Sequence, residues 1–372
     1  MKINIKDINY NNFLKIILIN ISVFLCSIVI LEIVFGNWFN PKNIKKLKII
    51  VDRVLTYEID HIYPSNNKSS IYTRDEFGFR GSYPNVNSIN ILTLGGSTTD
   101  QRYITDGETF QDVLQENFQS IGKNVYVVNA GVDGQSSYGH IKNFDYWFNN
   151  IKDLKTDYFL FYIGVNDFYK NEGYENDKMD FSELDIKSKI KNTIKSKSAI
   201  YDLIQTILNV LKAKGFDLPR RTDHIYDKFT NENWVSEPKQ SNHKEKLYNR
   251  LLTYKQRLRI LCDRVESFGS KSIFVTQSRR RKYDFINGEL YGIPKLTKYD
   301  DYYYNGVDYY HMIRLYHESL KEICEENGSI FIDLDKELEF DIKNDFYDYT
   351  HHTPSGAEKI GDYLFKKLKH LY

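Results

Sequence analysis

The stretch YFLFYIGVND, residues 158–167, decides the fold of this chain. Its first six residues are all apolar or aromatic. They do not alternate as in a strand with one face in water, so they predict a strand buried on both faces. Strands of this kind belong to parallel sheets that carry helices on both sides. The GVND turn therefore lies at the carboxyl end of the strand, the edge where open parallel sheets bind their ligands.

Strand-like runs and helical patterns alternate on both sides of this stretch, as expected of a sheet covered by helices. The other predicted strands are 90–94, 125–129, 272–277 and 330–333. The predicted helices are 108–119, 136–150, 244–268, 306–327 and 354–369. We therefore predict an α/β fold of three layers, α/β/α, around a five-stranded parallel sheet.

The interval between the third and fourth predicted strands is too long for a single crossover helix. It holds more than 100 residues, and we predict a helical insertion at about 168–245. This insertion is either a lid beside the active edge of the sheet or an elaboration that only packs. The folded domain is predicted over 86–372, after a turn-rich connecting segment over 40–85.

An apolar run near the amino terminus predicts a transmembrane helix. Residues 16–31 contain no charge. The run resumes after Glu32 and continues to Phe35, giving about 20 residues, near the length that spans a bilayer. No small-x-small cleavage site follows Phe35, which favours a retained anchor over 1–39 rather than a cleaved signal peptide. More basic residues follow the span than precede it, and this count by itself favours a cytoplasmic main body.

Composition and charge exclude several classes of protein. The chain has 51 Lys plus Arg against 50 Asp plus Glu, so its net charge of +1 gives no global field to hold nucleic acid. The 30 Tyr and 23 Phe exclude a disordered chain. The three cysteines lie far apart without CxxC spacing, which excludes a disulfide scaffold and a zinc ribbon.

The segments that follow the predicted strands carry the residues that acyl transfer requires. A serine hydroxyl needs a base within hydrogen-bond reach, and the base needs a partner that fixes its tautomer. Ser97 after the first strand, with His351 and Asp348 before the last helix, satisfies these needs. The oxyanion needs oriented donors, which the backbone N–H groups of Ser97 and Gly134 and the side-chain amide of Asn166 can supply.

Each of these motifs has an ordinary explanation when taken alone. The Gly-Gly-Ser-Thr turn at 95–98 lacks the lysine and the spacing of a P-loop, and it is not a GxGxxG fingerprint. Asn166-Asp167 is by default turn chemistry. The pair His351-His352 has no further ligands at metal spacing, so we do not expect a metal site there. The serine mechanism requires neither a metal nor an organic cofactor. The stronger signal is that all four motifs stand in order at the ends of predicted strands.

This ordered set resembles the SGNH hydrolases, also called GDSL-like esterases, whose four blocks are named for Ser, Gly, Asn and His. Ser97, Gly134 and Asn166 match the first three blocks. Asp348 and His351 match the Asp-x-x-His of the last block. The resemblance implies a flavodoxin-like fold in which these residues form the catalytic triad and the oxyanion hole.

The resemblance covers about 74–369. The motif DEFGFRG at 75–81 also looks like membrane-anchored or secreted bacterial members, which often act on cell-surface glycans. Gly96 stands where many members have Asp, and Thr98 where many have Leu, so the first block is a GGST variant. This departure leaves the nucleophile in place and weakens the expectation of a lipase-like substrate.

The resemblance implies a serine esterase that removes acetyl or another small acyl group from a cell-envelope or secreted carbohydrate. Two alternatives stay open: an O-acyltransferase that modifies a surface glycan with the same residues, and a catalytically silent glycan-binding protein. The family points to a catalytic domain outside the cytoplasm on a single-pass anchor. We expect that location, against the charge count.

A basic run after the fourth predicted strand is a candidate substrate surface. Arg279, Arg280 and Arg281 lie at the same edge of the sheet and can orient an anionic sugar, phosphate or carboxylate through bidentate hydrogen bonds. Tyr302 belongs to a tyrosine cluster whose ring faces suit sugars. A solvated loop, or one paired with nearby acids, explains the run equally well, and a chain with 30 tyrosines clusters some by chance.

Overall fold

The computed structural model describes residues 10–36, 38, 39, 47, 49–169, 194, 197–201, 203, 204, 233–279, 282–299 and 302–372. The chain divides into two compact units. The smaller unit comprises Met1–Lys46 and Asp180–Pro219. The larger unit comprises Leu47–Met179 and Arg220–Tyr372 and contains every residue of the candidate site.

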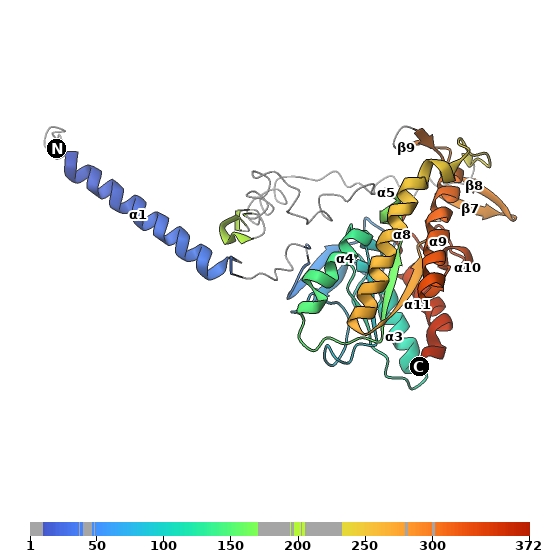
Figure 1. The fold of residues 1–372 in the computed structure, drawn as a ribbon, viewed down its shortest axis with the longest axis horizontal. Helices are drawn as coiled ribbons and strands as arrows, with labels where there is room; N and C mark the ends of the chain where they lie inside the picture. The colour runs from blue at the N-terminus through green and yellow to red at the C-terminus, as the bar shows by residue number, and fades with distance from the viewer. Residues whose placement is uncertain are drawn as a thin grey trace. The chain divides into compact units, whose positions relative to one another are not determined.

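The larger unit is built on a five-stranded parallel sheet in the order β11-β6-β5-β3-β4. Helices lie around these strands in Figure 1. The strands are β3 (Ile91–Gly95), β4 (Val127–Asn129), β5 (Tyr158–Ile163), β6 (Lys271–Thr276) and β11 (Ile330–Ile332). The predicted α/β fold is therefore confirmed, with each strand within two residues of its expected position. β5, which is formed by the apolar stretch at 158–163, lies in the middle of the sheet.

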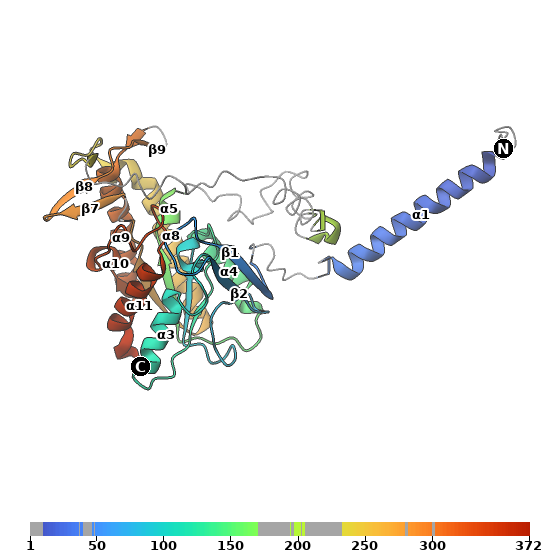
Figure 2. The same ribbon diagram turned by 180° about the vertical axis from the view of Figure 1, so that it is seen from behind.

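β5 is buried on both faces because its successive side chains enter two different helical layers. The covering helices are α3 (Phe110–Ser120), α4 (Ser137–Tyr146), α8 (His243–Phe268), α9 (Gly306–Asn327) and α11 (Pro354–Leu368). Leu160 and Tyr162 pack in the aliphatic core beneath α3 and α11. Phe159 enters the opposite layer, where its ring centroid lies 4.9 Å from that of Phe144 in α4. Figure 2 shows the α3 and α11 side of the sheet.

Short elements follow the strands of the sheet. They are α2 (Ser97–Asp100) after β3, α5 (Val165–Tyr169) after β5 and α10 (Leu334–Glu337) after β11, with the 3-10 turns η3 (Phe148–Asn150) and η6 (Lys369–Leu371) elsewhere. Two small hairpins that were not predicted follow β6. They pair β7 (Tyr283–Ile286) with β8 (Glu289–Gly292) and β9 (Thr297–Tyr299) with β10 (Tyr302–Tyr304).

A hairpin occupies much of the segment that was predicted to be a connection, residues 40–85. β1 (Arg53–Glu58) pairs antiparallel with β2 (Ser69–Arg74). Alternate side chains of β2 are buried, among them Tyr72 and Arg74. The larger unit thus begins at Leu47 rather than near residue 86. The sequence conceals this because one of the buried positions is an arginine, which hydrophobic patterns count as exposed.

The smaller unit contains α1 (Tyr10–Phe35). Its residues Leu14–Phe35 have a mean hydropathy of 2.7, so by length and composition this helix can cross a membrane. The Glu32 carboxylate accepts hydrogen bonds from Ser198 Oγ at 2.5 Å and from the N–H groups of Ala199 and Ile200 at 3.1 Å. It therefore caps the helical residues that begin at 199.

The predicted insertion at 168–245 is described only in part. Residues 199–201, 203 and 204 are helical. Val235 pairs with Gly292 at the end of β8. Residues 170–193 and 205–232 lie outside the described part of the chain, so the choice between lid and packing elaboration stays open.

Candidate active site

The turn of Ser97, the predicted nucleophile, follows β3 without a linker. Ser97 begins α2 directly after Gly95 and Gly96. A Cβ on Gly95 would lie 2.0 Å from Thr99 Oγ1, and a Cβ on Gly96 would lie 2.2 Å from Asn166 Nδ2. The two glycines are thus required by close approach, and the second of them lets the Asn166 side chain lie against the residue before Ser97.

Ser97, His351 and Asp348 form one hydrogen-bonded row. His351 Nε2 lies 2.7 Å from Ser97 Oγ, and His351 Nδ1 lies 2.7 Å from Asp348 Oδ2. The imidazole stacks on Tyr347 with ring centroids 5.5 Å apart and an interplanar angle of 9°. Since Nδ1 faces a carboxylate, it carries the proton, and Nε2 is left free to accept the serine proton.

The Asp348 carboxylate is held ionised by its own loop. Its Oδ1 accepts the backbone N–H groups of Thr350 and His351, each at 2.7 Å. Burial raises the pKa of Asp348, but the neighbouring His351 and these hydrogen bonds outweigh burial and lower it to about 2. The carboxylate therefore stays charged and keeps its partner imidazole oriented over the whole neutral range.

Asn166, a predicted oxyanion-hole residue, is hydrogen-bonded to the residue that follows Gly134, the other one beyond Ser97. Asn166 Nδ2 donates to the carbonyl of Gln135 at 2.7 Å, and Gln135 directly follows Gly134. Gly134 has a φ of +76°, a conformation that favours glycine, and no atom lies within 4 Å of the position a Cβ would take. Asn166 uses one amide hydrogen on this contact, which leaves the second hydrogen to donate beside Ser97.

Gln277 connects the turn of Ser97 to α5 and was not predicted. Its Nε2 donates to Thr98 Oγ1 at 2.6 Å, and its Oε1 accepts the N–H of Val165 at 2.8 Å. Asp167, predicted to shape its turn, accepts from Ser137 N and from Arg257 Nη2 and is buried. Asn166 therefore lies between two anchored neighbours, and its side chain is positioned before any substrate binds.

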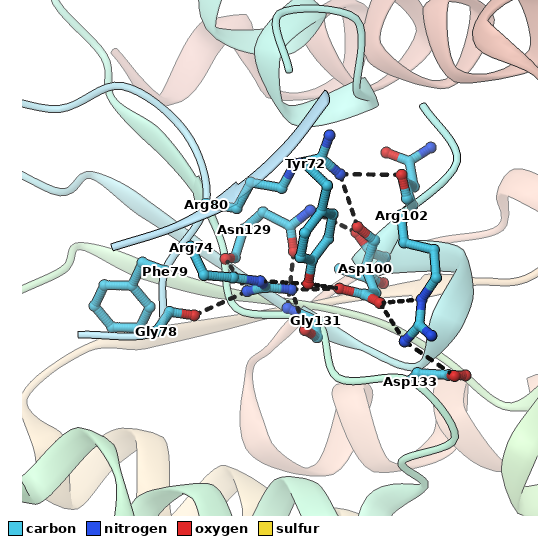
Figure 3. A network of polar contacts seen from close by, with 12 residues as sticks. Tyr72, Arg74, Gly78, Phe79, Arg80, Asp100, Arg102, Asn129, Gly131 and Asp133 are labelled. Atoms are coloured by element: carbon cyan, nitrogen blue, oxygen red, sulfur yellow. Dashed lines mark hydrogen bonds and ion pairs between the residues drawn. The ribbon is translucent and has the colours of Figure 1, made fainter. Parts of the chain in front are cut away.

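A buried ion pair joins the Ser97 turn to the loop of Gly134, and Figure 3 shows this network. Arg74 Nη2 lies 2.5 Å from Asp100 Oδ1 and donates to the carbonyl of Gly131 at 2.6 Å. Arg74 Nη1 donates to the carbonyl of Asn129 at 3.0 Å. Asp100 ends the helix that Ser97 begins, so the guanidinium fixes two of the predicted site segments to each other.

The other side of Asp100 faces Arg102. Arg102 Nη2 lies 3.1 Å from Asp100 Oδ2 and 3.0 Å from Asp133 Oδ2 (Figure 3). Burial raises the pKa of Asp100, but the guanidinium groups of Arg74 and Arg102 outweigh burial and hold the pKa below its usual range. Two arginines thus compensate two aspartates beside the loop of Gly134.

A pocket of about 350 Å³ opens at this network. It is lined by Ile49, Ile50, Tyr72, Arg74, Asp100, Arg102 and residues 131–134. Its volume is in the range of small-molecule sites, which runs from roughly 300 to 1,000 Å³. Because Gly134 is part of its wall, the pocket adjoins the predicted oxyanion hole.

The predicted substrate residues fall in different places. Arg280 and Arg281 lie outside the described residues. Arg279 Nε donates to the carbonyl of Tyr349, in the loop that carries the triad acid and base, at 3.2 Å. Tyr302 lies in β10, where Lys246 Nζ is 4.4 Å from its ring centroid. The structure thus brings Arg279 to the loop of Asp348 and His351. Lys282, which was not among the predicted substrate residues, contacts Tyr169 in α5.

His352 differs from its neighbour His351 in its surroundings. Its ring stacks on Phe340 and Phe346 with centroids 5.1 and 4.4 Å away, and Nε2 lies 3.3 Å from Tyr162 Oη. Burial lowers the pKa of His352 to about 3, so this imidazole is neutral in the core.

Within the described residues no three His, Cys, Asp or Glu side chains gather in an arrangement that could hold a metal ion.

No protein-family model matches the sequence, and no curated protein matches it either. Among solved structures, TesA has a TM-score of 0.42 and 10% identity, over 76% of this chain and 99% of its own. A GDSL-like lipase from Bacteroides thetaiotaomicron has a TM-score of 0.38 and 9% identity, over 78% and 93%. A member of the lipolytic G-D-S-L family from Veillonella parvula has 0.36 and 14%, over 76% and 98%.

These TM-scores are all below 0.5, so the assignment of the site depends on the geometry of its own side chains. In the order of its sequence blocks, and in the row of Ser97, His351 and Asp348 that two of those blocks form, this chain resembles the SGNH hydrolases.

Proposed function

We propose that this protein is a serine esterase that removes acetyl or another small acyl group from a carbohydrate. One observation carries the proposal: His351 bridges the Ser97 hydroxyl and the Asp348 carboxylate through two contacts of 2.7 Å. A serine becomes a nucleophile when a base of this kind can accept its proton.

The reaction follows from the direction of these contacts. Ser97 Oγ forms a bond to the ester carbonyl carbon while His351 Nε2 accepts the hydroxyl proton. Asp348 stabilises the resulting imidazolium. His351 then gives the proton to the leaving sugar oxygen, and the C–O bond to the sugar breaks. In the second half, water attacks the acyl-serine, His351 accepts and returns a proton in the same way, and the free acid leaves.

The negative charge that forms on the carbonyl oxygen needs donors that are already in place. We assign this task to the backbone N–H groups of Ser97 and Gly134 and to the Asn166 side chain. Asn166 is supported by the Gln135 carbonyl and Gly134 by the Arg74 contact to Gly131.

The pocket beside Gly134 supports a carbohydrate as the alcohol part of the ester. Its walls carry two guanidinium and two carboxylate groups, so they attract no net charge. They do offer donors and acceptors to a neutral ligand rich in hydroxyl groups. Asp133 has a half-exposed side chain, and its ion pair with Arg102 lies at the exposed end of the network.

The proposed location is outside the cytoplasm, with α1 as a membrane anchor. The helix has the length and composition to span a bilayer, and acylated surface glycans lie on the outer side. Protease treatment of intact cells or spheroplasts tests the orientation, because cleavage of the larger unit without lysis is expected. Protection of that unit until lysis would place it in the cytoplasm.

The experiment that tests the activity replaces the nucleophile. Ser97→Ala in the detergent-solubilised full chain is expected to lower kcat on p-nitrophenyl acetate by about 10⁶-fold. The variant should also lose labelling by a fluorophosphonate probe. Ser120→Ala, an exposed serine in α3, serves as the matched control and should keep both properties. Unchanged turnover in Ser97→Ala would remove Ser97 from the mechanism.

A further inference from the structure

Two buried cations lie near the loop of Asp348 and His351, and no carboxylate of the described residues pairs with them. The side chains of Arg279 and Lys282 belong to residues that are only 8% and 7% exposed. Within the described residues, neither side chain has a carboxylate oxygen within the 4.0 Å of an ion pair. Among the described residues, Lys282 is the only buried lysine, and every other lysine is at least partly exposed. Charges are almost never buried in this way unless they are paired.

The remaining buried arginines of the described residues show how this chain normally treats such a charge. Each of them contacts an aspartate: Arg74 contacts Asp100 at 2.5 Å, Arg80 contacts Asp106 at 2.6 Å and Arg257 contacts Asp167 at 3.3 Å. A purely structural Arg279 would be expected to follow the same rule. Its departure from the rule indicates that its counter-charge comes from elsewhere.

Tyrosines replace carboxylates around the two cations. Tyr169 Oη accepts from Arg279 Nη1 at 2.5 Å and from Lys282 Nζ at 2.7 Å. Lys282 Nζ also lies 4.7 Å from the ring centroid of Tyr309, and Arg279 Cζ lies 5.4 Å from it. Cation–π contacts of this kind compensate only part of the cost of removing a charge from water.

Ionisation of the phenol does not neutralise the cluster. Burial raises the pKa of Tyr169, but Arg279 and Lys282 outweigh burial and lower it. Burial, reinforced by Arg279, lowers the pKa of Lys282. When Lys282 is protonated, two cations face one anion even with Tyr169 fully ionised, so a positive charge is left over in a poorly solvated place.

The cluster touches two of the segments that form the candidate active site. Arg279 Nε donates to the carbonyl of Tyr349, which directly follows Asp348. Tyr169 ends α5, the short helix that carries Asn166. A substrate group near this cluster would therefore lie on the α5 and β6 side of the triad, whereas the neutral pocket lies beside Gly134.

We propose that Arg279 and Lys282 bind an oxyanion, a carboxylate or a phosphate, that the substrate carries near its ester. This inference rests on the proposed esterase function and narrows its substrate class to acylated carbohydrates with an acidic group. The bound anion supplies the missing counter-charge. Arg279 offers a planar fork of donors, and Lys282 adds a point charge.

Binding is tested without turnover in the detergent-solubilised full chain carrying Ser97→Ala. Sodium phosphate is expected to raise its melting temperature above that in sodium chloride of equal ionic strength. Adding Lys282→Met should remove this difference. Adding Arg259→Met, which changes an exposed arginine in α8, should keep it. An equal response to phosphate in the Lys282→Met and Arg259→Met backgrounds would overturn the proposal.

Stability separates ligand binding from a structural contribution of the lysine. In the absence of phosphate, Lys282→Met should keep or raise the melting temperature, because it removes a buried charge that no carboxylate of the described residues compensates. A marked loss of melting temperature, rescued by Lys282→Arg in the absence of any anion, would mean that the cation serves the fold and would sink the proposal.

A comparison of kcat/KM values tests whether the substrate itself carries the anion. An acetylated methyl glucuronide with a free carboxylate should have a kcat/KM at least about tenfold above that of the matching acetylated methyl glucoside. Lys282→Met and Arg279→Gln should bring the ratio close to one, and Lys282→Arg should preserve it. Equal kcat/KM values in the parent enzyme, despite phosphate binding, would show that the anion is not part of the substrate.

The two proposals fail in different ways. If the parent chain does not turn over p-nitrophenyl acetate but binds phosphate in a manner that depends on Lys282, the esterase proposal is refuted and the anion site is kept. Turnover that depends on Ser97, with no phosphate response and no preference for the uronate, would refute the anion site and keep the esterase.

Discussion

Two polar clusters flank the candidate active site, and they treat charge in opposite ways. On the side of Gly134, Arg74 and Arg102 meet Asp100 and Asp133, so the charges cancel. On the side of α5, Arg279 and Lys282 meet phenol and carbonyl oxygens. A compensated cluster can only hold segments in place, whereas an uncompensated one gains free energy when an anion arrives. The difference indicates which cluster positions the site and which recognises the substrate.

The largest effect is expected on the compensated side. Asp100→Ala leaves the Arg74 guanidinium buried without its counter-charge, which should lower the free energy of unfolding by about 3 to 5 kcal/mol. Urea unfolding of the full chain in detergent, followed by tryptophan fluorescence, measures this loss. A cost below about 1 kcal/mol would mean that the two clusters are alike after all, since Lys282→Met is expected to cost nothing.

The next effect concerns Asn166, which lies between the two clusters. Asn166→Ala removes the amide that is tied to Gln135 and should lower kcat by about 10² to 10³-fold with little change in the melting temperature. Steady-state kinetics on p-nitrophenyl acetate measure it. Asn249→Ala, which changes an exposed asparagine in α8, provides the control. Full activity of the Asn166 variant would exclude Asn166 from the oxyanion hole.

A pH titration probes the loop that Arg279 contacts. The folded pKa of Asp348 is about 2, below the usual 3.8. The contribution of Asp348 is therefore complete above about pH 4 and is lost as the pH falls towards 2. The shift corresponds to about 2 kcal/mol of unfolding free energy, which urea unfolding between pH 5 and pH 2 would register. Asp348→Asn should flatten that part of the profile. An unchanged profile would contradict the assignment.

The smallest effect is expected from an ion pair in neither cluster. Arg259 and Glu326 form two hydrogen bonds of 2.9 and 3.0 Å between α8 and α9, with both side chains at least 40% exposed. Arg259→Ala should cost no more than about 0.5 kcal/mol by the same urea unfolding. A cost near that of Asp100→Ala would show that burial is not what distinguishes the charge pairs of this protein.

The sheet and the triad loops were accessible to sequence reasoning because their signals are local. The six apolar residues of β5 are enough to predict that this strand is buried. Asp348 and His351 are three residues apart on one loop, so their pairing can also be predicted locally. The hairpin of β1 and β2 was not accessible, because Arg74 becomes a buried residue only through Asp100, 26 positions away. The residues next to Arg74 in the sequence give no indication that Asp100 is its partner.

The basic run at 279–282 shows a different limit. Its composition is that of a solvated loop, and the prediction singled out the three arginines rather than the lysine. The structure turns Arg279 and Lys282 inward onto Tyr169. Which residues of a charged run are buried depends on the path of the backbone after β6. That path cannot be predicted from the amino-acid composition of the run.

The contact between Gly96 and Asn166 makes these two positions epistatic. Any β-carbon at 96 would occupy the space of the Asn166 amide, so an aspartate there is tolerated only if the amide relocates. A single change to the Gly-Asp-Ser form of the first block is therefore expected to be harmful in this chain. Among relatives, the residue before the nucleophile should covary with the geometry of the third block. Engineering of this turn has to treat the two sites as one unit.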